Sequence, residues 1–413
     1  MDSVLRSHAD AVIQASITAV LPNEAVKRAL EDRVFSGRVL LVAAGKAAWQ
    51  MAKAAYDVMG DRIENGVVVT KYDHVMGPIG NFLCYEAGHP VPDENSFKGT
   101  QAALDLVRDL TEADTVLFLL SGGGSALFEK PLVSGEVLQD ITGQLLACGA
   151  DIVEINTIRK RLSAVKGGRF ALACAPAQVF SIVLSDILGD PLDMIASGPA
   201  VPDSSTSEQA VAIARKYALQ MPQSAWVLLE QETPKILTNV TTQINGSVKE
   251  LCAAAGEACR KLGYEPVVLT DQLSCQAKEA GSFLASILKT HANSGKDLAF
   301  LAGGETVVQL TGKGKGGRNQ ELALSAAAGI AGISGAAVFS VGSDGTDGPT
   351  DAAGGYVDYT TEAELKAQGI EIYRVLQDND AYHALQKVGG LVMTGPTGTN
   401  VNDVAVALLK VNE

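Results

Sequence analysis

The stretch from residue 312 to residue 318, GKGKGGR, places four glycines beside three cations, Lys313, Lys315 and Arg318. Glycine lets backbone N–H groups approach an oxyanion closely, and a helix that starts directly after such a loop adds positive potential. The next residues, NQELALSAAA, have the composition of a helix. The loop therefore suits a densely charged group such as a triphosphate or a transferring phosphoryl group. A solvated basic turn is the alternative.

The same stretch formally contains G-x-G-x-x-G, at Gly312, Gly314 and Gly317, after the predicted strand ETVVQL. This is the context of a dinucleotide site, which would make the chain an NAD(P)H-dependent reductase. The acidic residue that binds the ribose is expected about 20 positions further on, and no convincing candidate stands there. A reductase is therefore the second hypothesis for function.

A second glycine loop, SGGGSA, follows the apolar run VLFLL and precedes a predicted helix. Its glycines, Gly122, Gly123 and Gly124, favour binding of a phosphate or carboxylate, and Ser121 and Ser125 add hydrogen-bond donors. It is not a Walker A loop, because no G-K-[ST] follows. A tight strand-to-helix turn is the alternative.

Two acidic loops also follow predicted strands. VGSDGTDGPTDAAGG carries Asp344, Asp347 and Asp351, and LSDILGD carries Asp186 and Asp190. Their spacing is not that of an EF-hand, but such carboxylates can hold Mg²⁺ through waters or accept a proton from a substrate hydroxyl. Aspartate and glycine are also ordinary turn residues, so each aspartate has a structural alternative.

The remaining cations stand in two places. Lys46 lies where the first predicted strand turns into a helix, and NTIRKRLSAVKGGR contains Arg159, Lys160, Arg161, Lys166 and Arg169 with no acid between them. We expect some of these five to face solvent and others to contact an anion. His89 lies on a predicted loop from which it could reach a substrate. The five histidines have no metal-ligand spacing, and no G-x-S-x-G is present.

Composition narrows the class of protein. The chain has 413 residues, 47% of them apolar, and a net charge of −14, which disfavours binding of nucleic acid or anionic membranes. The six cysteines form no C-x-x-C pair and lie mostly in apolar runs, so we expect free thiols and a cytoplasmic location. The uncharged run 323–342 is better explained by a helix and a buried strand than by a membrane span.

Short β-branched runs alternate with alanine-rich runs along the chain, as in RVLLVAAG followed by KAAWQMAKAAYDVMG. This alternation predicts an α/β fold with mainly parallel sheets and helices on both faces. We expect a larger, Rossmann-like N-terminal domain at 1–235 and a C-terminal domain at 236–413, whose last residues could pack back on the first. In such sheets ligands bind beyond the carboxyl ends of the strands, where the glycine and aspartate loops fall. The cations of these loops can neutralise phosphate oxygens, and the aspartates can hold a metal ion and orient a hydroxyl group. Together the two kinds of loop indicate phosphoryl transfer.

Eight motifs, in order from about residue 40 to about 405, resemble those of the class II glycerate 2-kinases, whose C-terminal part is the MOFRL domain. They are AAGKAAW, GHPVPDENS, LLSGGGSALFEKP, NTIRKRLSAVKGGR, LSDILGDPLDMIASGP, LAGGETVVQLTGKGKGGRNQELAL, GSDGTDGPTDAAGG and TGPTGTNVNDV. The resemblance implies ATP-dependent phosphorylation of the 2-hydroxyl of D-glycerate with Mg²⁺, in a cleft between two α/β domains. Family members are often labelled hydroxypyruvate reductases, from their place in tartrate degradation, and that activity is the alternative.

The resemblance places the catalytic lysine at Lys46, the arginine at Arg318, and functional aspartates at Asp186 or Asp190 and at Asp344. Combined with the loops above, it gives a full set of expected site residues. Those expected in catalysis are Lys46, Arg318, Asp186 and Asp344. Those expected to bind phosphate or nucleotide are Ser121, Gly122, Gly123, Gly124, Ser125, Lys313, Gly314, Lys315, Gly316 and Gly317. Those expected to bind substrate are Asn156, Arg159, Lys166 and Glu305, and those expected to bind metal are Asp190 and Asp347. A homodimer is possible.

Overall fold

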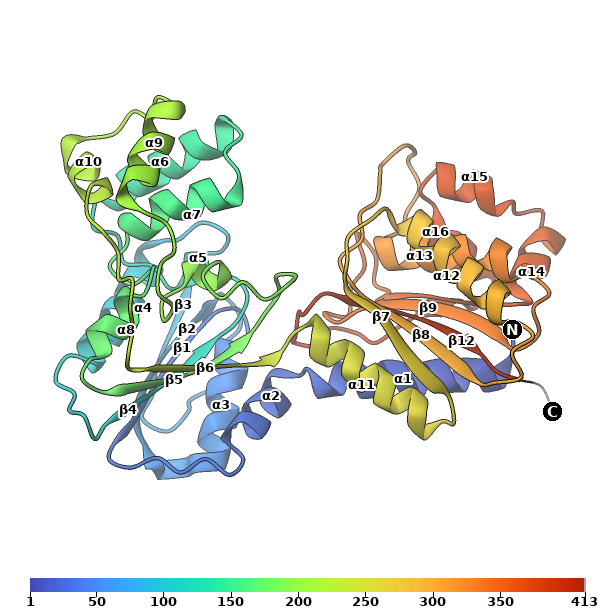
Figure 1. Cartoon of the computed structure of the whole chain (residues 1–413), viewed down its shortest axis with the longest axis horizontal. Helices are drawn as coiled ribbons and strands as arrows, with labels where there is room; N and C mark the ends of the chain where they lie inside the picture. Colours follow the sequence, from blue (N-terminus) through green and yellow to red (C-terminus); the bar gives the residue numbers. More distant parts are fainter. Residues whose placement is uncertain (412–413) are drawn as a thin grey trace. The chain divides into compact units, whose positions relative to one another are not determined.

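The computed structural model describes residues 1–411, which form two compact units. The N-terminal unit contains residues 22–185 and 190–245, and the C-terminal unit contains residues 1–21, 186–189 and the chain from 246 onward. Each unit has its own sheet and its own buried core (Figure 1). The structure thus has two units, as the sequence predicts, but divides the chain differently from the expected 1–235 and 236–413.

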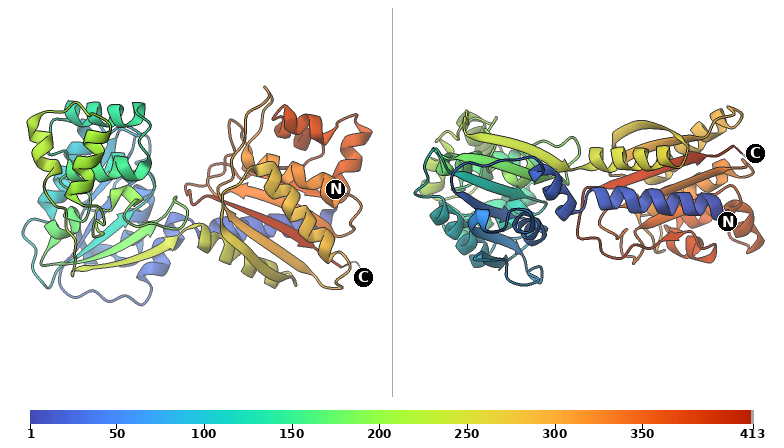
Figure 2. Two further views of the ribbon diagram at one scale, coloured as in Figure 1. Left: turned by 45° about the horizontal axis from the view of Figure 1, so that its top comes forward. Right: turned by 90° about the horizontal axis from the view of Figure 1, so that it is seen from below.

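The first helix accounts for part of this difference. Helix α1 (Ser3–Ala19) buries Leu5, Val12 and Ile13 in the core of the C-terminal unit. It lies alongside α11 (Val248–Lys261), as Figure 2 shows. At the other boundary, strand β6 (Val240–Gly246) extends the first sheet, so the N-terminal unit continues past residue 235.

The N-terminal unit is built on a six-stranded sheet in the order β3-β2-β1-β4-β5-β6. The other five strands are β1 (Val39–Ala44), β2 (Ile63–Lys71), β3 (Leu83–Ala87), β4 (Thr115–Leu120) and β5 (Gln178–Leu184), and they pair in parallel. Every residue of β1 and β4 is buried, as expected for parallel strands covered on both faces. This strand order is that of the Rossmann fold, and its topological switch point lies between β1 and β4.

Helices surround this sheet in two groups. The helices next to the sheet are α2 (Pro22–Leu30), α3 (Ala48–Met59), α4 (Glu94–Leu106), α5 (Gly124–Leu127) and α8 (Arg169–Cys174). A separate helical layer has its own apolar core and consists of α6 (Gly135–Ala147), α7 (Ile152–Arg161), α9 (Ser207–Lys216) and α10 (Gln223–Leu229). Two short 3-10 turns lie at Gly60–Arg62 and Ile195–Ser197.

The C-terminal unit has a mixed six-stranded sheet in the order β11-β10-β9-β12-β8-β7. Its strands are β7 (Glu265–Leu273), β8 (Leu298–Gly304), β9 (Ala336–Gly342), β10 (Gly354–Asp358), β11 (Leu391–Val392) and β12 (Asp403–Leu409). Only β7 and β8 pair in parallel, and the other neighbours are antiparallel. The reason is local: β9 and β10 are joined by a loop without a crossover helix, and β12 inserts between β8 and β9. The α/β class is confirmed, and the parallel pairing is found mainly in the first sheet.

Helices cover both faces of the second sheet (Figure 1). Helices α1 and α11 pack on one face, and the other face carries α12 (Ala277–His291), α13 (Arg318–Ile330), α14 (Thr361–Ala367), α15 (Ile372–Gln377) and α16 (Ala381–Lys387). The uncharged run 323–342 forms part of α13 and the buried strand β9, as predicted. No helix between residues 1 and 411 combines the length and apolar character needed to cross a membrane. All six cysteines are free thiols.

Candidate functional site

The basic glycine loop lies against the segment 378–380, which we call the DND segment after its residues Asp-Asn-Asp. The N–H groups of Thr311 and Gly312 donate to Asn379 Oδ1 at 2.7 and 2.9 Å. Asn379 has φ 55°, a left-handed conformation that asparagine tolerates better than most residues. The residues before the loop, 306–310, form no strand, although the sequence predicts one there.

The aspartates of the DND segment take up the next donors of the loop. Lys313 N–H donates to Asp378 Oδ1 at 3.0 Å, and Gly314 N–H donates to the Asp378 carbonyl at 2.7 Å. Lys315 N–H donates to Asp380 Oδ1 at 2.9 Å. Successive N–H groups of the loop are therefore already hydrogen-bonded within the chain. This differs from the predicted role of these amides as a phosphate cradle.

Close approach explains the glycines of this loop. A Cβ on Gly312 would lie 2.3 Å from Asp378 Cα, and one on Gly314 would lie 2.4 Å from Asp380 Cβ. These distances are far below van der Waals contact, so any larger residue would force the loop away from the DND segment. The glycines pack one segment of backbone against another, which also removes the structural basis for a dinucleotide loop here.

Arg318 is the first residue of α13 and lines a pocket of the C-terminal unit. Its Nε and Nη2 donate to the two oxygens of Asp403 at 2.5 and 3.1 Å, and Nη1 donates to Glu305 Oε1 at 2.8 Å. Partial burial lowers the pKa of Arg318. The hydrogen bonds and charge of Asp403, together with the charge of Glu305, have the larger opposite effect, so the pKa of Arg318 is raised. The guanidinium group is thus charged and fixed in one orientation, which is the preorganisation that catalysis by charge stabilisation requires.

Asp347 caps α13 from a different loop. Its Oδ1 accepts from the backbone N–H of Asn319 at 3.1 Å, and its Oδ2 accepts from the N–H of Gln320 at 2.9 Å. Burial raises the pKa of Asp347 to about 6, although these hydrogen bonds act in the opposite direction. Both oxygens are occupied by helix N–H groups, so the geometry shows a helix cap where the sequence suggested a metal ligand.

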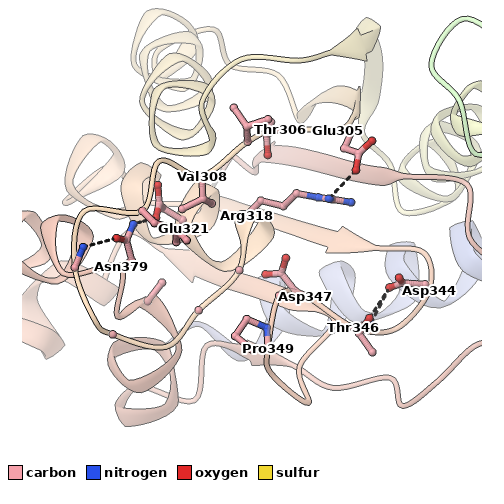
Figure 3. Close-up of a pocket in the computed structure, with 18 of the residues that line it drawn as sticks. Glu305, Thr306, Val308, Arg318, Glu321, Asp344, Thr346, Asp347, Pro349 and Asn379 are labelled. Carbon is pink, nitrogen blue, oxygen red and sulfur yellow. Dashed lines mark hydrogen bonds and ion pairs between the residues drawn. The ribbon is translucent and has the colours of Figure 1, made fainter. Parts of the chain in front are cut away.

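These groups line a pocket of about 760 Å³ in the C-terminal unit (Figure 3). Its polar side chains include Glu305, Arg318, Glu321, Asp344 and Asp347. Its apolar lining consists of Leu188, Val307, Val308, Leu310, Pro349 and Ala381. The volume is in the range of small-molecule sites, and the mixture of apolar walls with a few fixed polar groups is typical of them.

Asp344 contributes a partly exposed carboxylate to this pocket. Its Oδ1 accepts from the N–H and hydroxyl of Thr346 at 2.9 and 3.1 Å, which is an ordinary aspartate turn. No donor among residues 1–411 bonds its Oδ2. Asp344 therefore has one oxygen available for a substrate hydroxyl or a hydrated cation.

In the N-terminal unit, the predicted catalytic lysine and the SGGGS loop lie together at the switch point of the sheet. Lys46 follows β1, and its N–H donates to the Gly122 carbonyl in the loop after β4, at 2.9 Å. A Cβ on Gly123 would lie 3.1 Å from Lys46 Cγ and 3.0 Å from His89 Cδ2, so both side chains lie against the loop. Burial and the charges of Lys46 and Lys71 lower the pKa of His89, which favours its neutral form.

The end of the SGGGS loop continues into a chain of buried polar groups. Ser125 and Ser197 hydroxyls are 3.3 Å apart, and Ser197 Oγ donates to Asn156 Oδ1 at 2.9 Å. Ser197 and the preceding Ala196 have φ 60° and 50°, which are strained for residues other than glycine. Arg159 Nη2 donates to the Ser125 carbonyl at 3.0 Å, and its buried Nε has no partner among the described residues. Two predicted substrate residues, Asn156 and Arg159, thus contact this loop region directly.

Lys166, a third predicted substrate residue, is fully buried. Its Nζ lies 2.9 Å from Glu129 Oε2 and donates to the Phe128 carbonyl at 3.0 Å. Burial lowers the pKa of Lys166 to about 8, with the charge of Glu129 acting against this shift. The buried ion pair ties the segment after α7 to the segment after α5, which is a structural role.

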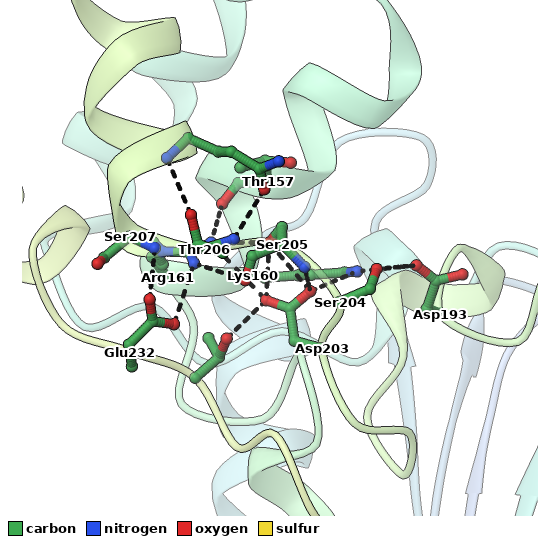
Figure 4. Close-up of polar contacts among 12 residues, drawn as sticks. Thr157, Lys160, Arg161, Asp193, Asp203, Ser204, Ser205, Thr206, Ser207 and Glu232 are labelled. Carbon is green, nitrogen blue, oxygen red and sulfur yellow. Dashed lines mark hydrogen bonds and ion pairs between the residues drawn. The ribbon is translucent and has the colours of Figure 1, made fainter.

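Two further cations of this segment are also buried, where we expected some to face solvent. Lys160 Nζ donates to Asp203 Oδ1 at 3.1 Å, and Arg161 Nη1 donates to the Ser205 hydroxyl at 2.9 Å (Figure 4). Arg161 also lies 3.6 Å from Glu232. The acids that neutralise this segment come from distant positions in the chain, which is why the local sequence appears uniformly basic.

The aspartates after β5 occupy the place where the chain passes between the units. Asp186 is partly buried and belongs to the C-terminal unit, whereas Asp190 belongs to the N-terminal unit. Asp190 has φ 51°, and its buried Oδ1 has no hydrogen-bond partner among residues 1–411. An orphaned carboxylate oxygen of this kind is suited to a cation ligand.

Several site residues could not be identified from the sequence. Asp403 binds Arg318 across 85 positions of the chain, and the DND segment binds the glycine loop across 65 to 68 positions. Glu321 and Asn379 contact each other in the pocket wall at 3.2 Å. The one local signal for Asp403 was its position in TGPTGTNVNDV, the last of the motifs.

The geometry defines an α/β protein with a fixed, carboxylate-paired arginine in a pocket suited to a small anionic ligand. A model of a domain of unknown function, DUF4147, matches residues 8–230, and the MOFRL family model matches residues 298–403. The chain is 54% identical to D-glycerate 2-kinase of Thermotoga maritima, over 98% of both chains. It is also 38% identical to a protein of Agrobacterium vitis, over 96% of this chain and 93% of that protein. The name of that protein is a provisional assignment as a hydroxypyruvate reductase.

A solved structure, glycerate kinase of Thermotoga maritima, has a TM-score of 0.95 to this chain and covers 99% of it and 100% of its own length. A second, from Pyrococcus horikoshii, has a TM-score of 0.94 at 40% identity and covers 100% of this chain and 99% of its own. The chain belongs to the MOFRL-containing family of glycerate kinases.

Proposed function

We propose that the chain is an ATP-dependent kinase that transfers the γ-phosphoryl group to the 2-hydroxyl of D-glycerate, giving 2-phosphoglycerate. The observation that carries this proposal is the Arg318 guanidinium, which is fixed by Asp403 and Glu305 at the wall of a pocket of about 760 Å³. Phosphoryl transfer depends on positioning and charge stabilisation more than on covalent chemistry, and a preorganised cation supplies both.

In this arrangement, some N–H groups of the Arg318 guanidinium are available to a ligand. A guanidinium group carries five N–H donors, and Asp403 and Glu305 use three of them. The other two can bind oxygens of the transferring phosphoryl group or the carboxylate of glycerate. Because the neighbouring acids hold the group in place, little side-chain entropy is lost when the ligand binds.

The other predicted residues receive the following roles. Asp344 orients the 2-hydroxyl through its Oδ2, which no donor among residues 1–411 occupies, with Asp186 as the alternative for this role. Lys46 and the SGGGS loop bind anionic oxygens of phosphate or glycerate at the switch point of the first sheet, and Arg159 fixes that loop through the Ser125 carbonyl. Lys166 acts through its ion pair with Glu129 and not by contact with substrate.

Mg²⁺ would neutralise charge on the ATP phosphates when bound. The orphaned Oδ1 of Asp190 fits a ligand of such an ion, whereas Asp347 does not, because both its oxygens cap α13. Among residues 1–411, no group of three or more acids, histidines or cysteines is arranged to hold a metal by itself. Kinases commonly hold Mg²⁺ through one or two carboxylates and the phosphates, so a single aspartate fits this pattern. A cytoplasmic location and a homodimer remain predictions.

The test is to incubate the protein with ATP, Mg²⁺ and D-glycerate, to measure ADP with a coupled assay, and to identify the product by phosphorus NMR. We expect ADP release that depends on glycerate and a phosphorus signal on the 2-position. The control assay follows NADPH absorbance with hydroxypyruvate, and we expect no turnover. NADPH oxidation without ADP release would replace the kinase with the reductase, and a 3-phosphoglycerate signal would correct the hydroxyl.

A further inference from the structure

The pocket of the C-terminal unit has two ends of different character. At one end, the Arg318 guanidinium points towards Glu305, and at the other Glu321 points towards Asn379 (Figure 3). Arg318 and Glu321 are three residues apart on α13, so they share a helix face while their side chains point apart. Val308 is drawn between the two ends in Figure 3 and belongs to the apolar wall.

Glu321 is an unusual residue for a pocket wall. It is only 4% exposed, and the one side-chain donor bonded to it among residues 1–411 is Asn379 Nδ2, on Oε2 at 3.2 Å. Burial raises the pKa of Glu321, with the Asn379 hydrogen bond and the charge of Lys278 acting against it. The second oxygen, Oε1, accepts no hydrogen bond from another side chain among residues 1–411, and Glu321 lines the pocket, so this oxygen is available to a ligand.

Asn379 holds Glu321 in a defined orientation. Its Oδ1 accepts from the N–H groups of Thr311 and Gly312, and its Nδ2 donates to the Gln309 carbonyl at 3.1 Å as well as to Glu321. The amide therefore cannot turn over without breaking all these bonds. It follows that one oxygen of the Glu321 carboxylate, Oε2 in this structure, is held by Asn379, and the other, Oε1, is the one available to a ligand.

We propose that this end of the pocket binds the base of the nucleotide, and that Glu321 Oε1 accepts a hydrogen bond from the exocyclic amino group of adenine. A purine ring is flat, uncharged and apolar on both faces, so it suits the wall formed by Val307, Val308 and Leu310. The phosphates, in contrast, are repelled by Glu321 and attracted by Arg318. The inference rests on the proposed kinase function. It adds that the Glu321 end of the pocket recognises the base of the nucleotide.

A purely structural role for Glu321 makes a different prediction. If Glu321 only braces the glycine loop through Asn379, its replacement weakens every nucleotide equally. If it reads the base, replacement changes the preference between ATP and inosine triphosphate, in which a carbonyl oxygen takes the place of the amino group. The ratio of affinities for these two nucleotides therefore separates the two roles.

The experiment measures dissociation constants of ATP and inosine triphosphate by calorimetry, and kcat/KM for each with D-glycerate, in the full chain and in two variants. In Glu321→Gln, the amide oxygen takes the Asn379 bond and the NH₂ group faces the base, so acceptor becomes donor. We expect the ATP-to-inosine-triphosphate affinity ratio to fall at least about tenfold, as hydrogen-bond mismatches commonly cause. Glu321→Leu should bind both nucleotides more weakly with little preference.

Glu257→Gln, on the exposed face of α11, is the matched control and should keep the wild-type ratio. Melting temperatures of the variants exclude unfolding as the cause. An unchanged ratio in Glu321→Gln with intact kinase activity would overturn the base site and leave the proposed function standing. A lowered binding ratio in a chain that releases no ADP with glycerate would support the base site and overturn the kinase.

Discussion

Two segments of this chain are rich in cations, and the structure uses them in opposite ways. In the segment 159–169, Lys160, Arg161 and Lys166 are buried, and each is paired with an acid from a distant part of the N-terminal unit. In the loop 312–318, the N–H groups of residues 312–315 are bound by the DND segment, while the side chain of Arg318 faces a pocket.

The comparison shows that positive charge in a sequence does not by itself indicate an anion site. Buried cations neutralised by the chain build the fold, because an unpaired charge in the interior would be too costly. A cation that keeps free donors at a pocket wall is available for a ligand. Arg318 keeps two such donors after its pairing with Asp403 and Glu305, whereas Lys166 is enclosed completely.

The largest effect on stability is expected for Lys166→Met. Removing this partner leaves the buried Glu129 carboxylate uncompensated, which destabilises by about 3–5 kcal/mol. Denaturant unfolding of the variant measures this loss. The double variant Lys166→Met with Glu129→Gln should recover most of it, because the carboxylate that lost its ion-pair partner is then neutral. A single variant as stable as wild type would contradict the structural role of this pair.

A smaller effect, dependent on pH, is expected from the cap of α13. The pKa of Asp347 is about 6 in the folded chain against its usual value of 3.8, so the folded state holds the proton more tightly. Its contribution to the free energy of unfolding is therefore fully present below about pH 4 and is lost as pH rises through about 6, an effect of about 2–3 kcal/mol. Asp347→Asn removes this titration.

The measurement is denaturant unfolding of wild type and Asp347→Asn between pH 4 and pH 7. The stability difference, wild type minus variant, should rise as the pH falls through 6 towards 4. A difference that is constant across this range would show that Asp347 does not titrate there.

A smaller effect again is expected where the glycine loop meets the DND segment. Gly314→Ala places a methyl group 2.4 Å from Asp380 Cβ, and such overpacking costs about 1–3 kcal/mol. Gly143→Ala is the control, because its Cβ meets nothing within 4 Å in helix α6 and should be neutral or slightly stabilising. If Gly314→Ala were as harmless as Gly143→Ala, the close packing described for this loop would be incorrect.

The fold could be predicted from the sequence where the signal is local. Apolar runs such as residues 39–44 and 115–120 are buried strands, and the expected helix and strand in 323–342 are both present. The direction of β12 could not be predicted, because it depends on where the last strand enters the sheet. The position of α1 could not be predicted either, because the amphipathic pattern of a helix does not show which unit the helix packs against.

The candidate site was predictable in part for the same reason. Arg318, Lys46 and the SGGGS loop stand in local patterns that suit anions, and the structure places each beside a pocket or at the switch point of a sheet. Their partners, Asp403, Glu129 and the DND segment, are distant in the chain. Only the folded structure shows which donors are already occupied, and that decides which cations remain for chemistry.

The measurement that tests the central claim most directly is single-turnover transfer of phosphate from ATP to D-glycerate by Arg318→Ala. The claim predicts a loss of at least ~3 kcal/mol of transition-state stabilisation, or about a hundredfold or more in rate. Arg318→Lys should recover only part of this loss, because it cannot reproduce the forked contacts. A rate near that of wild type for Arg318→Ala, in a variant that remains folded, would remove Arg318 from the reaction and contradict the account.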